Sequence, residues 1–500
     1  MQQDIADIES ASNGVSDWLA GLGVAEAAAA IRDGETSSEA YASALLQRAR
    51  VQADLNAFIT IDEEAVLNAA RNADKARTGG STSPLLGVPL AIKDSYLTLG
   101  LRTTLGVRNL ESYVPSKDAE VVSAIKGAGG IVFGKNNLVE MSYGLTGNNE
   151  VYGQVKNPHG RDHVSGGSSS GAGSSVAARI VPAALGGDTV GSIRVPAALC
   201  GVVGFKPTTG RWPRDGVAPI SHTLDTTGVL ARSVDDCMLI DQVVTGAEAV
   251  APANYADLKD VRLAFAPRQY LSLVDPEIEI HFTETVRRLR DAGAEVVEVD
   301  LGEDFLSITQ RATWRIFFHE TMEAVSEFLQ RNAVPTSFEE IYAGLKSGLK
   351  DVWGHVVLPS GPGFSPNEYQ ASISVDRPEI QRRYRDALAR SGTTALLFPT
   401  TPGTAPQIEH QTKFLIAGRE VSDLTLHSTL SRRVWQACQA SAFQRACPAM
   451  GFRLGSRSTG STVETEAFFN WRAVSKNLLG CWRRQFERQV TQAFASISET

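Results

Sequence analysis

The 500-residue sequence has little cysteine, no excess of positive charge and no long apolar run. Five cysteines, an odd number in so long a chain, do not predict a disulfide framework, so we expect a cytoplasmic protein. A net charge of −8 excludes a general nucleic-acid binder, which needs lysine and arginine to neutralise phosphates. No run approaches the roughly 18 apolar residues of a membrane span. Residues 1–23 also lack the basic and apolar regions of a secretion signal, so no membrane contact is expected.

Metal and phosphate sites are missing from the sequence patterns as well. No cysteine and histidine grouping has zinc-binding spacing, and no glycine loop has the phosphate-binding form, so we expect neither metal nor cofactor. The chain also lacks internal repeats and low-complexity linkers, while 43% of its residues are hydrophobic. This composition predicts one large domain with a sizeable core.

The first 80 residues have the pattern of helices. We expect helices over 25–31, 40–50 and 65–77, the second of them capped by the segment Thr36–Glu39. From Leu85 short apolar strands alternate with helices, which is typical of a layered α/β domain. The expected strands cover 87–93, 130–135, 201–205, 261–265 and 395–398, and a helix covers 121–128.

Between Asp275 and Arg390 the pattern is mostly helical, with helices expected over 278–289, 314–329, 338–349 and 379–389. Such an insertion either covers the mouth of a site or serves only for packing, and the sequence leaves both open. The expected divisions are therefore a helical lead-in over 1–80, a core over 81–270, a substrate-side insertion over 271–390, a return to the core sheet over 391–430 and an atypical segment over 431–500.

The stretch from Ser165 to Arg211 is rich in glycine, serine and alanine and almost free of charge, so backbone can approach backbone or substrate closely there. It contains Ser168 and Ser192, which are 24 residues apart. A serine needs a base before it becomes a nucleophile. Neighbouring His159 and His163 lie in a polar segment and are expected on the surface.

Lys93 is the alternative base, because it ends an apolar run and burial lowers the pKa of a lysine. An ordinary lysine at a strand end gives the same local pattern. A second pattern competes as well, since Gly167–Gly171 fits the G-x-S-x-G turn that would make Ser169 the nucleophile. That turn follows a strand, and 158–163 does not have the pattern of one, so we favour the first interpretation.

These motifs resemble the amidase signature family. The resemblance rests on Gly166–Gly210, on the segment Gly87–Asp94 and on Leu396–Pro402, and it extends over about residues 25–430. It implies an α/β amidase-signature fold, in which a large mixed β-sheet is sandwiched between helices in a single large domain with a helical insertion. It also implies a serine hydrolase that cuts the C–N bond of a small amide through an acyl-enzyme.

The resemblance assigns roles to individual residues. Ser192 corresponds to the nucleophile, Ser168, after a cis peptide bond, to the bridging serine and Lys93 to the base. The oxyanion hole would consist of the backbone N–H groups of Thr189, Val190, Gly191 and Ser192. The family usually has glycine where this chain has Val190, so the valine side chain must turn away or narrow the acyl pocket. Supporting residues would be Ser169, Asp188 and Arg194, and the substrate pocket would include Met141, Ser142 and Gly144.

Within the family, the segments 210–221, 224–228 and 241–246 resemble indoleacetamide and mandelamide hydrolases, which implies small primary amides of aryl or heteroaryl acetic acids as substrates. Three alternatives stay open: an aryl-acylamidase or carbamate (urethane) hydrolase with the same triad, the amidase subunit of a tRNA-dependent amidotransferase, and a catalytically dead scaffold. Small-molecule amides are the expected partners, and a homodimer is one assembly that the sequence allows.

The resemblance stops near Leu430. The segment from Ser431 holds three of the five cysteines and three of the seven tryptophans. Suitable codons for Val434–Gly460, read in another frame, spell VAGLPGISIPAGLSGDGLPVGLEIDG, which has the glycine-proline pattern of the family. We therefore predict a frameshift near Leu430, in which case Cys438, Cys447 and Cys481 have no chemical role. The gene sequence tests this prediction, and codons incompatible with the second frame would rule it out.

Overall fold

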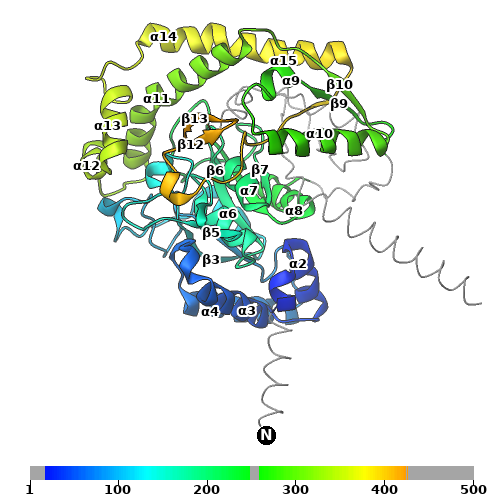
Figure 1. Ribbon diagram of the computed structural model, residues 1–500. Coiled ribbons are helices and arrows are strands. Elements are labelled where there is room, and N and C mark those ends of the chain that lie inside the picture. Colours follow the sequence, from blue (N-terminus) through cyan, green and yellow to red (C-terminus); the bar gives the residue numbers. More distant parts are fainter. Residues whose placement is uncertain (1–16, 248–257, 424, 426–500) are drawn as a thin grey trace, which may run out of the picture.

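The computed structural model describes residues 17–247, 258–423 and 425, and a six-stranded mixed sheet lies at its centre (Figure 1). The spatial order is β1-β3-β2-β6-β8-β7. Strand β2 is parallel to β3 and β6, whereas β1 and β8 are antiparallel to their neighbours. The strands are β1 Phe58–Thr60, β2 Pro89–Lys93, β3 Ile131–Asn136, β6 Ala183–Asp188, β7 Val203–Phe205 and β8 Thr226–Ala231.

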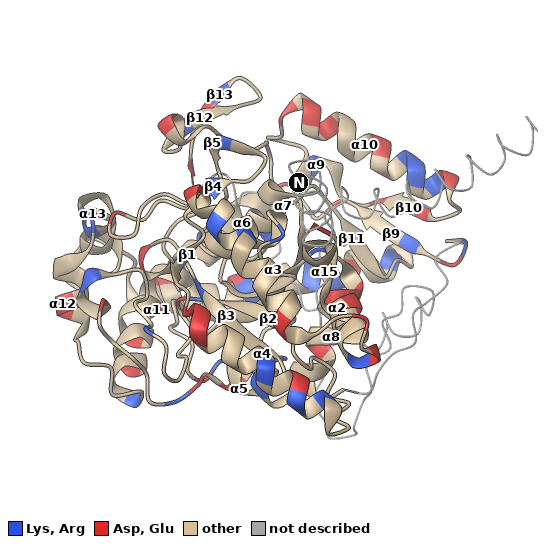
Figure 2. Ribbon diagram, turned by 90° about the horizontal axis from the view of Figure 1, so that it is seen from below, with Lys and Arg blue, Asp and Glu red and all other residues tan. Residues whose placement is uncertain are grey.

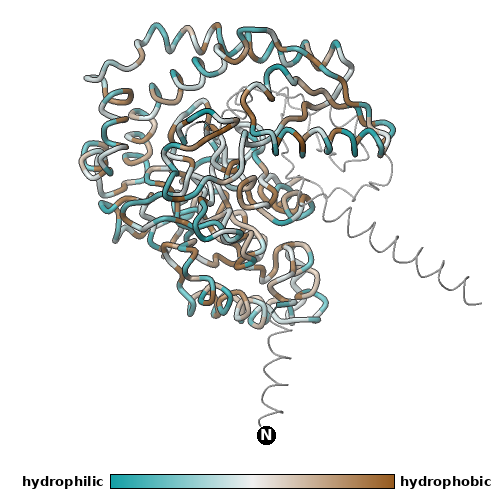
Figure 3. The backbone as a smooth tube through the Cα atoms, viewed as in Figure 1, coloured by the Kyte–Doolittle hydropathy of each residue, from teal (hydrophilic) through white to brown (hydrophobic). Residues whose placement is uncertain are grey.

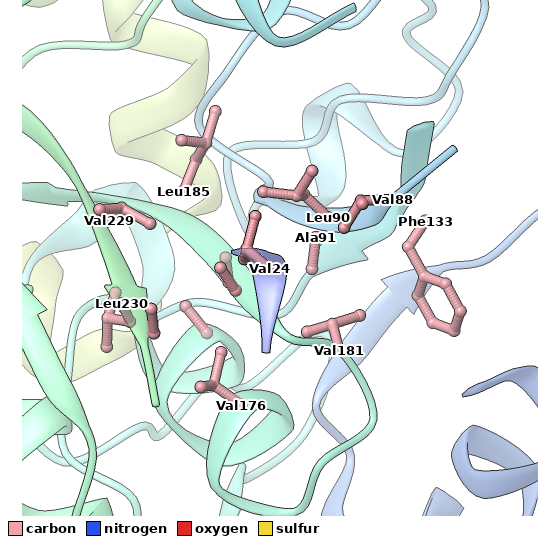
Figure 4. Packing of buried hydrophobic residues seen from close by; sticks show 14 of the residues in the cluster. Val24, Val88, Leu90, Ala91, Phe133, Val176, Val181, Leu185, Val229 and Leu230 are labelled. Atoms are coloured by element: carbon pink, nitrogen blue, oxygen red, sulfur yellow. The ribbon is translucent and has the colours of Figure 1, made fainter. Parts of the chain in front are cut away.

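The central strands are buried on both faces. Every residue of β2 is buried, which explains why its continuous apolar run was recognisable as a strand. Strand β6 was not predicted, because its Ala-Ala-Leu-Gly-Gly-Asp sequence has no β-branched or aromatic residue. It is a strand because it pairs with β8 along its whole length. Figure 4 shows the packed side chains, among them Leu90, Leu185, Val229, Leu230 and Val176.

Helix α6 (Ser170–Ala177) accounts for the small residues of the glycine-serine stretch. It packs across β3, β2, β6 and β8. A Cβ atom on Gly171 would lie only 2.1 Å from the carbonyl oxygen of Ala57, so glycine is required where the helix meets the neighbouring chain. The composition therefore serves close packing of α6 beneath the candidate site.

The N-terminal helices are α2 (Val24–Asp33), α3 (Ser38–Val51) and α4 (Glu63–Thr78), and they lie at one end of the molecule (Figure 1). Each was predicted to within three residues at either end. The side chain of Ser37 accepts a hydrogen bond of 3.0 Å from the Ala40 N–H, which confirms the predicted cap.

A separate three-stranded parallel sheet has the order β10-β9-β11, with β9 at Arg262–Phe265, β10 at Glu295–Glu298 and β11 at Ala395–Leu397. Residues 391–430 were expected to return to the core sheet, but β11 pairs with β9 instead. The physical reason is that helix α10 (Pro276–Asp291) and these strands bury a hydrophobic cluster of their own, which includes Leu263, Phe282 and Val286.

Five helices, α11 to α15, form an arc at the end of the molecule opposite α2–α4 (Figure 1). They are α11 (Phe305–Arg331), α12 (Phe338–Gly344), α13 (Ser347–Val356), α14 (Pro366–Ala371) and α15 (Arg377–Ser391). The single helix predicted over 338–349 is wrong, because the chain turns between α12 and α13. There the backbone N–H of Lys346 donates to Glu140 at 3.3 Å and its Nζ donates to the Asn148 carbonyl at 3.2 Å. These bonds fix the chain to the core where the helix breaks.

The outer helices are amphipathic. Figure 2 shows acidic residues near the first half of α10 and basic residues near its end, an arrangement that complements the helix dipole. In Figure 3 the helices of the periphery alternate between hydrophilic and hydrophobic residues. None of the helices that the structure describes combines the length and apolar character needed to cross a bilayer. The atypical segment 431–500 and its predicted frameshift lie outside the described residues.

Candidate active site

Two charged residues end neighbouring parallel strands of the central sheet. Lys93 is the last residue of β2 and Asp188 is the last residue of β6, and the two strands pair through Ala91 and Ala184. The carboxyl ends of parallel strands meet at one edge of a sheet, where α/β proteins commonly place their sites. This edge therefore brings together residues that are far apart in the sequence.

Lys93 contacts Ser168 directly. Its Nζ atom donates a hydrogen bond of 2.8 Å to the Ser168 Oγ, and both side chains are buried. Burial lowers the pKa of Lys93 to about 7, although the carboxylates of Asp188 and Asp225 act in the opposite direction. A substantial fraction of the amine is therefore neutral near pH 7 and able to accept a proton.

Ser168 lies in the loop that leads into α6. The Gly167–Ser168 peptide bond is cis, as the resemblance implied. The Ser168 carbonyl accepts a hydrogen bond of 3.3 Å from the Val139 N–H. Next along the chain, the Ser169 N–H donates to the Ser192 carbonyl at 3.1 Å. The backbone of this loop is thus attached directly to the turn that carries Ser192.

Ser192 lies in the turn between β6 and α7 (Arg194–Cys200), which we call the 188–194 turn. The carboxylate of Asp188 organises it by accepting the N–H groups of Gly191, Ile193 and Arg194 at 2.8, 3.1 and 3.3 Å. Ser192 is 4% exposed, and its Oγ makes no hydrogen bond within the described residues.

A buried ion pair anchors the same turn. The Arg194 guanidinium donates to both oxygens of Asp188, at 2.7 and 2.8 Å. Burial raises the pKa of Asp188, but the charge and hydrogen bonds of Arg194 outweigh it and hold the pKa at about 2. Asp188 is consequently ionised over the whole physiological range.

The backbone N–H groups of the turn differ in their availability. Those of Thr189, Val190 and Ser192 find no acceptor among the described residues, whereas the Gly191 N–H is used by Asp188. Gly191 also has a φ of 139°, which favours glycine. The side chain of Val190 is buried in a hydrophobic cluster with Ile220 and Leu224, and Val190 is not among the residues that line the cavity described next.

A cavity of about 220 Å³ opens beside this group. Lys93, Ser168 and Thr189 provide polar lining, and apolar lining comes from Val217, Ala218, Pro219, Ile220 and Phe328. Charged side chains also line it, namely Arg214, Asp215, Glu327 and Arg331. The last two and Phe328 belong to α11, so the helical insertion forms one wall of the cavity.

The three predicted pocket residues have different positions. Ser142 lines the cavity, with a left-handed φ of 62°. Met141 is buried in another hydrophobic cluster, together with Trp353 and Val325, and Gly144 is not part of the lining. Only Ser142 of this set is therefore placed to touch a molecule in the cavity.

Ser169 supports the strand end. Its Oγ hydrogen-bonds at 3.2 Å with both the carbonyl and the N–H of Gly187. The expectation that the preceding segment is not a strand is wrong, because Gly160–Val164 form β5, which pairs with β4 (Lys156–Asn157). That pairing, in a polar sequence, was not visible as alternating hydrophobicity.

The structure adds a residue that the sequence interpretation did not assign to the site. Asp225 accepts the Thr189 hydroxyl at 2.7 Å and the N–H groups of Ile220 and Ser221 at 2.7 and 3.0 Å. Burial raises its pKa, while these hydrogen bonds partly oppose the rise. The available signal was the Leu224–Gly228 segment, which contributed to the family resemblance without suggesting a role.

Metal ligands are not grouped in the described ranges, where no three His, Cys, Asp or Glu side chains are placed to hold an ion. The chemistry that these residues can perform is proton transfer between Lys93 and Ser168. Ser192 is carried by the turn bonded to the loop of Ser168, although Ser192 itself is not among the residues that line the cavity.

Comparison with known proteins identifies the family. The model of the Amidase family matches residues 40–443. Mandelamide hydrolase of Pseudomonas putida is 34% identical over 398 residues, which cover 77% of this chain and 78% of that protein. Indoleacetamide hydrolase of Pseudomonas savastanoi is 34% identical over 385 residues, covering 76% and 81%. A glutamyl-tRNA(Gln) amidotransferase subunit of Roseiflexus sp. is 41% identical over 379 residues, covering 73% and 75%.

Solved structures agree with this result. A crystal structure of an amidase superposes with a TM-score of 0.73 and 27% identity, covering 83% of this chain and 91% of that one. The central mixed sheet and its many helices are thus the amidase-signature fold, as the sequence resemblance implied. The chain belongs to the amidase signature family and is an amide-hydrolysing enzyme.

Proposed function

We propose that the chain hydrolyses small amides through a Lys93–Ser168–Ser192 relay and an acyl-enzyme. The observation that carries this proposal is the 2.8 Å hydrogen bond between Lys93 Nζ and Ser168 Oγ at the lining of a cavity. A buried lysine whose pKa is about 7 can act as a general base near neutral pH. The relay therefore has a base in direct contact with its first hydroxyl.

In the proposed first step, neutral Lys93 takes the proton of Ser168, and Ser168 takes the proton of Ser192. The Ser192 Oγ attacks the amide carbonyl carbon, and a tetrahedral intermediate forms. The relay then returns a proton to the departing nitrogen, the C–N bond breaks and the acyl group stays on Ser192. Water, deprotonated through the same relay, attacks the acyl-enzyme and releases the acid.

The oxyanion of the intermediate requires preorganised donors. The N–H groups of Thr189, Val190 and Ser192 are the candidates, because they lack acceptors among the described residues. The Gly191 N–H was also expected to contribute, but its 2.8 Å bond to Asp188 makes it part of the support of the turn instead. Arg194 and Asp188 would hold these donors in place, and Ser169 would hold the adjoining strand end.

The proposed substrates are primary amides of aryl or heteroaryl acetic acids. Two observations favour them. Relatives about one third identical are named mandelamide hydrolase and indoleacetamide hydrolase. The cavity also has an apolar wall at Val217–Ile220 and Phe328, and Val190 is not part of its lining. A flat ring would bury its apolar surface against this wall.

Ammonia release from indole-3-acetamide and mandelamide tests this function. We expect the purified chain to release ammonia from at least one of them, and Ser192→Ala to release no more than the buffer blank, because it lacks the attacking oxygen. If the folded wild type releases no ammonia from either amide, the arylacetamide assignment is contradicted. Product from an anilide or a carbamate would then favour an aryl-acylamidase or urethane hydrolase with the same relay.

A second candidate is the amidase subunit of a tRNA-dependent amidotransferase, which the 41% identity to an amidotransferase subunit favours. In that case we expect the isolated chain to be inactive on free arylacetamides and to need partner subunits for activity. Activity of the purified chain alone on indole-3-acetamide would exclude it, so the same assay separates the two candidates.

A further inference from the structure

We propose that Glu320 of helix α11 is a positioning residue for the 188–194 turn, acting through the segment Ile220–Asp225. The inference rests on the proposed function, since it concerns the turn that carries the proposed nucleophile and oxyanion donors. It gives the helical insertion a part in catalysis in addition to its place in the cavity wall.

Glu320 is 4% exposed, and its carboxylate accepts four hydrogen bonds. One carboxylate oxygen accepts the Thr223 N–H at 3.0 Å and also the Ser221 hydroxyl. The other accepts the Thr223 hydroxyl at 2.5 Å and the hydroxyl of Tyr369, from α14, at 2.9 Å. Hydrogen bonds to a carboxylate are stronger than neutral ones, so the three from Ser221 and Thr223 hold this segment firmly against α11.

A hydrogen bond also connects the Ile220–Asp225 segment to the 188–194 turn. The Leu224 N–H donates to the Ser221 Oγ at 3.1 Å, and the Asp225 N–H donates to the Ser221 carbonyl at 3.2 Å. The Asp225 carboxylate accepts two N–H groups of its own segment and then the Thr189 hydroxyl, at 2.7 Å. Glu320 and Thr189 are therefore joined by a continuous series of hydrogen bonds through Asp225.

This series of bonds ends at residues that line the cavity, Asp225 and Thr189. Thr189 and Ser221 are buried, and Asp225 lines the cavity together with Lys93. Burial lowers the pKa of Lys93, and the Asp225 carboxylate partly opposes that fall. A shift of the Ile220–Asp225 segment would release the Thr189 hydroxyl and change the position of the adjoining N–H donors. Misplacement of reacting groups by about 1 Å can cost on the order of 10²-fold in rate. Glu320 thus bears on the rate without touching the substrate.

The test measures the reaction of the full chain with an alkyl fluorophosphonate, followed by intact mass. In this reaction the Ser192 oxygen bonds to phosphorus, fluoride leaves, and the hydroxyl proton passes through Ser168 to Lys93. The rate needs the nucleophile and the oxyanion donors but not a particular amide. A wild type that is not labelled on Ser192 would contradict the proposed function itself, whatever its substrate.

Glu320→Gln keeps the size of the side chain but replaces one acceptor with an NH₂ donor facing Ser221 and Thr223. We expect it to lower the labelling rate roughly 10- to 100-fold. Thr189→Val, which removes the hydroxyl and keeps the backbone N–H, is expected to lower it similarly. If Glu320 acts through Thr189, the double variant reacts within about twofold of Thr189→Val alone. Glu323→Gln, on an exposed position of the same helix, is the matched control and should label at the wild-type rate.

Losses that multiply in the double variant would overturn the proposal, as would a Glu320→Gln protein with a lower unfolding temperature but an unchanged labelling rate. If Glu320→Gln does not fold, Thr223→Val replaces it, because this change removes one of the same hydrogen bonds. The labelling rates of Thr223→Val, Thr189→Val and the double variant are then compared in the same way. Fold-losses in rate that multiply in that double variant would also overturn the proposal.

Discussion

Replacing Lys93 with methionine is expected to lower kcat by roughly three to four orders of magnitude, while the protein stays folded. General-base catalysis by a positioned side chain contributes about 10²–10⁴-fold, and without a base the Ser168 hydroxyl has no acceptor for its proton. Methionine has nearly the same length and is apolar, so it fits a position that is 1% exposed. The measurement is steady-state ammonia release at pH 8 from the best arylacetamide.

Stability separates this effect from a loss of structure. The pKa of Lys93 is lower in the folded state than in the unfolded state, so the unfolded state binds more protons between pH 7 and about 10. The free energy of unfolding therefore decreases as the pH falls through that range. Methionine removes this penalty, and we expect an unfolding temperature at or above that of the wild type. Lys126→Met, on α5 (Glu120–Gly127), removes a surface amine paired with Asp118 and should leave kcat unchanged. A Lys93→Met enzyme within tenfold of the wild type would contradict the relay.

Asp188→Asn is expected to cause the largest loss of stability, about 3–5 kcal/mol in the free energy of unfolding at pH 7. The change breaks a fully buried ion pair and removes the Asp188 charge from the Arg194 guanidinium. It also replaces an acceptor of three backbone N–H groups, so the 188–194 turn loses its support. Urea titration followed by circular dichroism measures the difference.

The sign of the pH dependence follows from the pKa of Asp188, which is about 2 and below its ordinary value. The stabilisation by the Asp188 carboxylate is present above the unfolded pKa and is lost as the pH falls through about 2. The difference in unfolding free energy between the wild type and Asp188→Asn should therefore have its full value at pH 7. Glu284→Gln is the matched control, because it breaks exposed ion pairs with Arg287 and Arg288 on α10. Its midpoint of urea unfolding should be close to that of the wild type. Equal midpoints for the two variants would show that the buried pair is not a major contribution.

Local sequence patterns were sufficient for the elements that position the relay. The apolar run before Lys93 predicted a buried strand ending in a lysine, and the glycine-serine stretch predicted close backbone packing. Their contact could not be read from spacing, because Lys93 and Ser168 are 75 residues apart and meet only when β2 and α6 pack together. The family resemblance supplied that pairing.

Longer-range features were missed for a common physical reason. Asp225 and Glu320 acquire meaning only from partners brought close by the fold, such as Thr223, which is 97 residues from Glu320 in the sequence. The burial of the Val190 side chain likewise depends on the hydrophobic cluster that the fold assembles around it. The assignment of β11 to the second sheet was also a matter of tertiary packing, since its three residues would fit either sheet.

The pH dependence of kcat/KM tests the central claim, that neutral Lys93 is the base, most directly. Because this parameter reports the free enzyme, the account predicts that it rises with pH, with a midpoint near 7, and reaches a plateau above it. Asp225→Asn should move the midpoint to lower pH, since it removes a carboxylate that raises the pKa of Lys93. A rate independent of pH from 5 to 9, or one that rises only near the ordinary lysine pKa of about 10.4, would contradict the account.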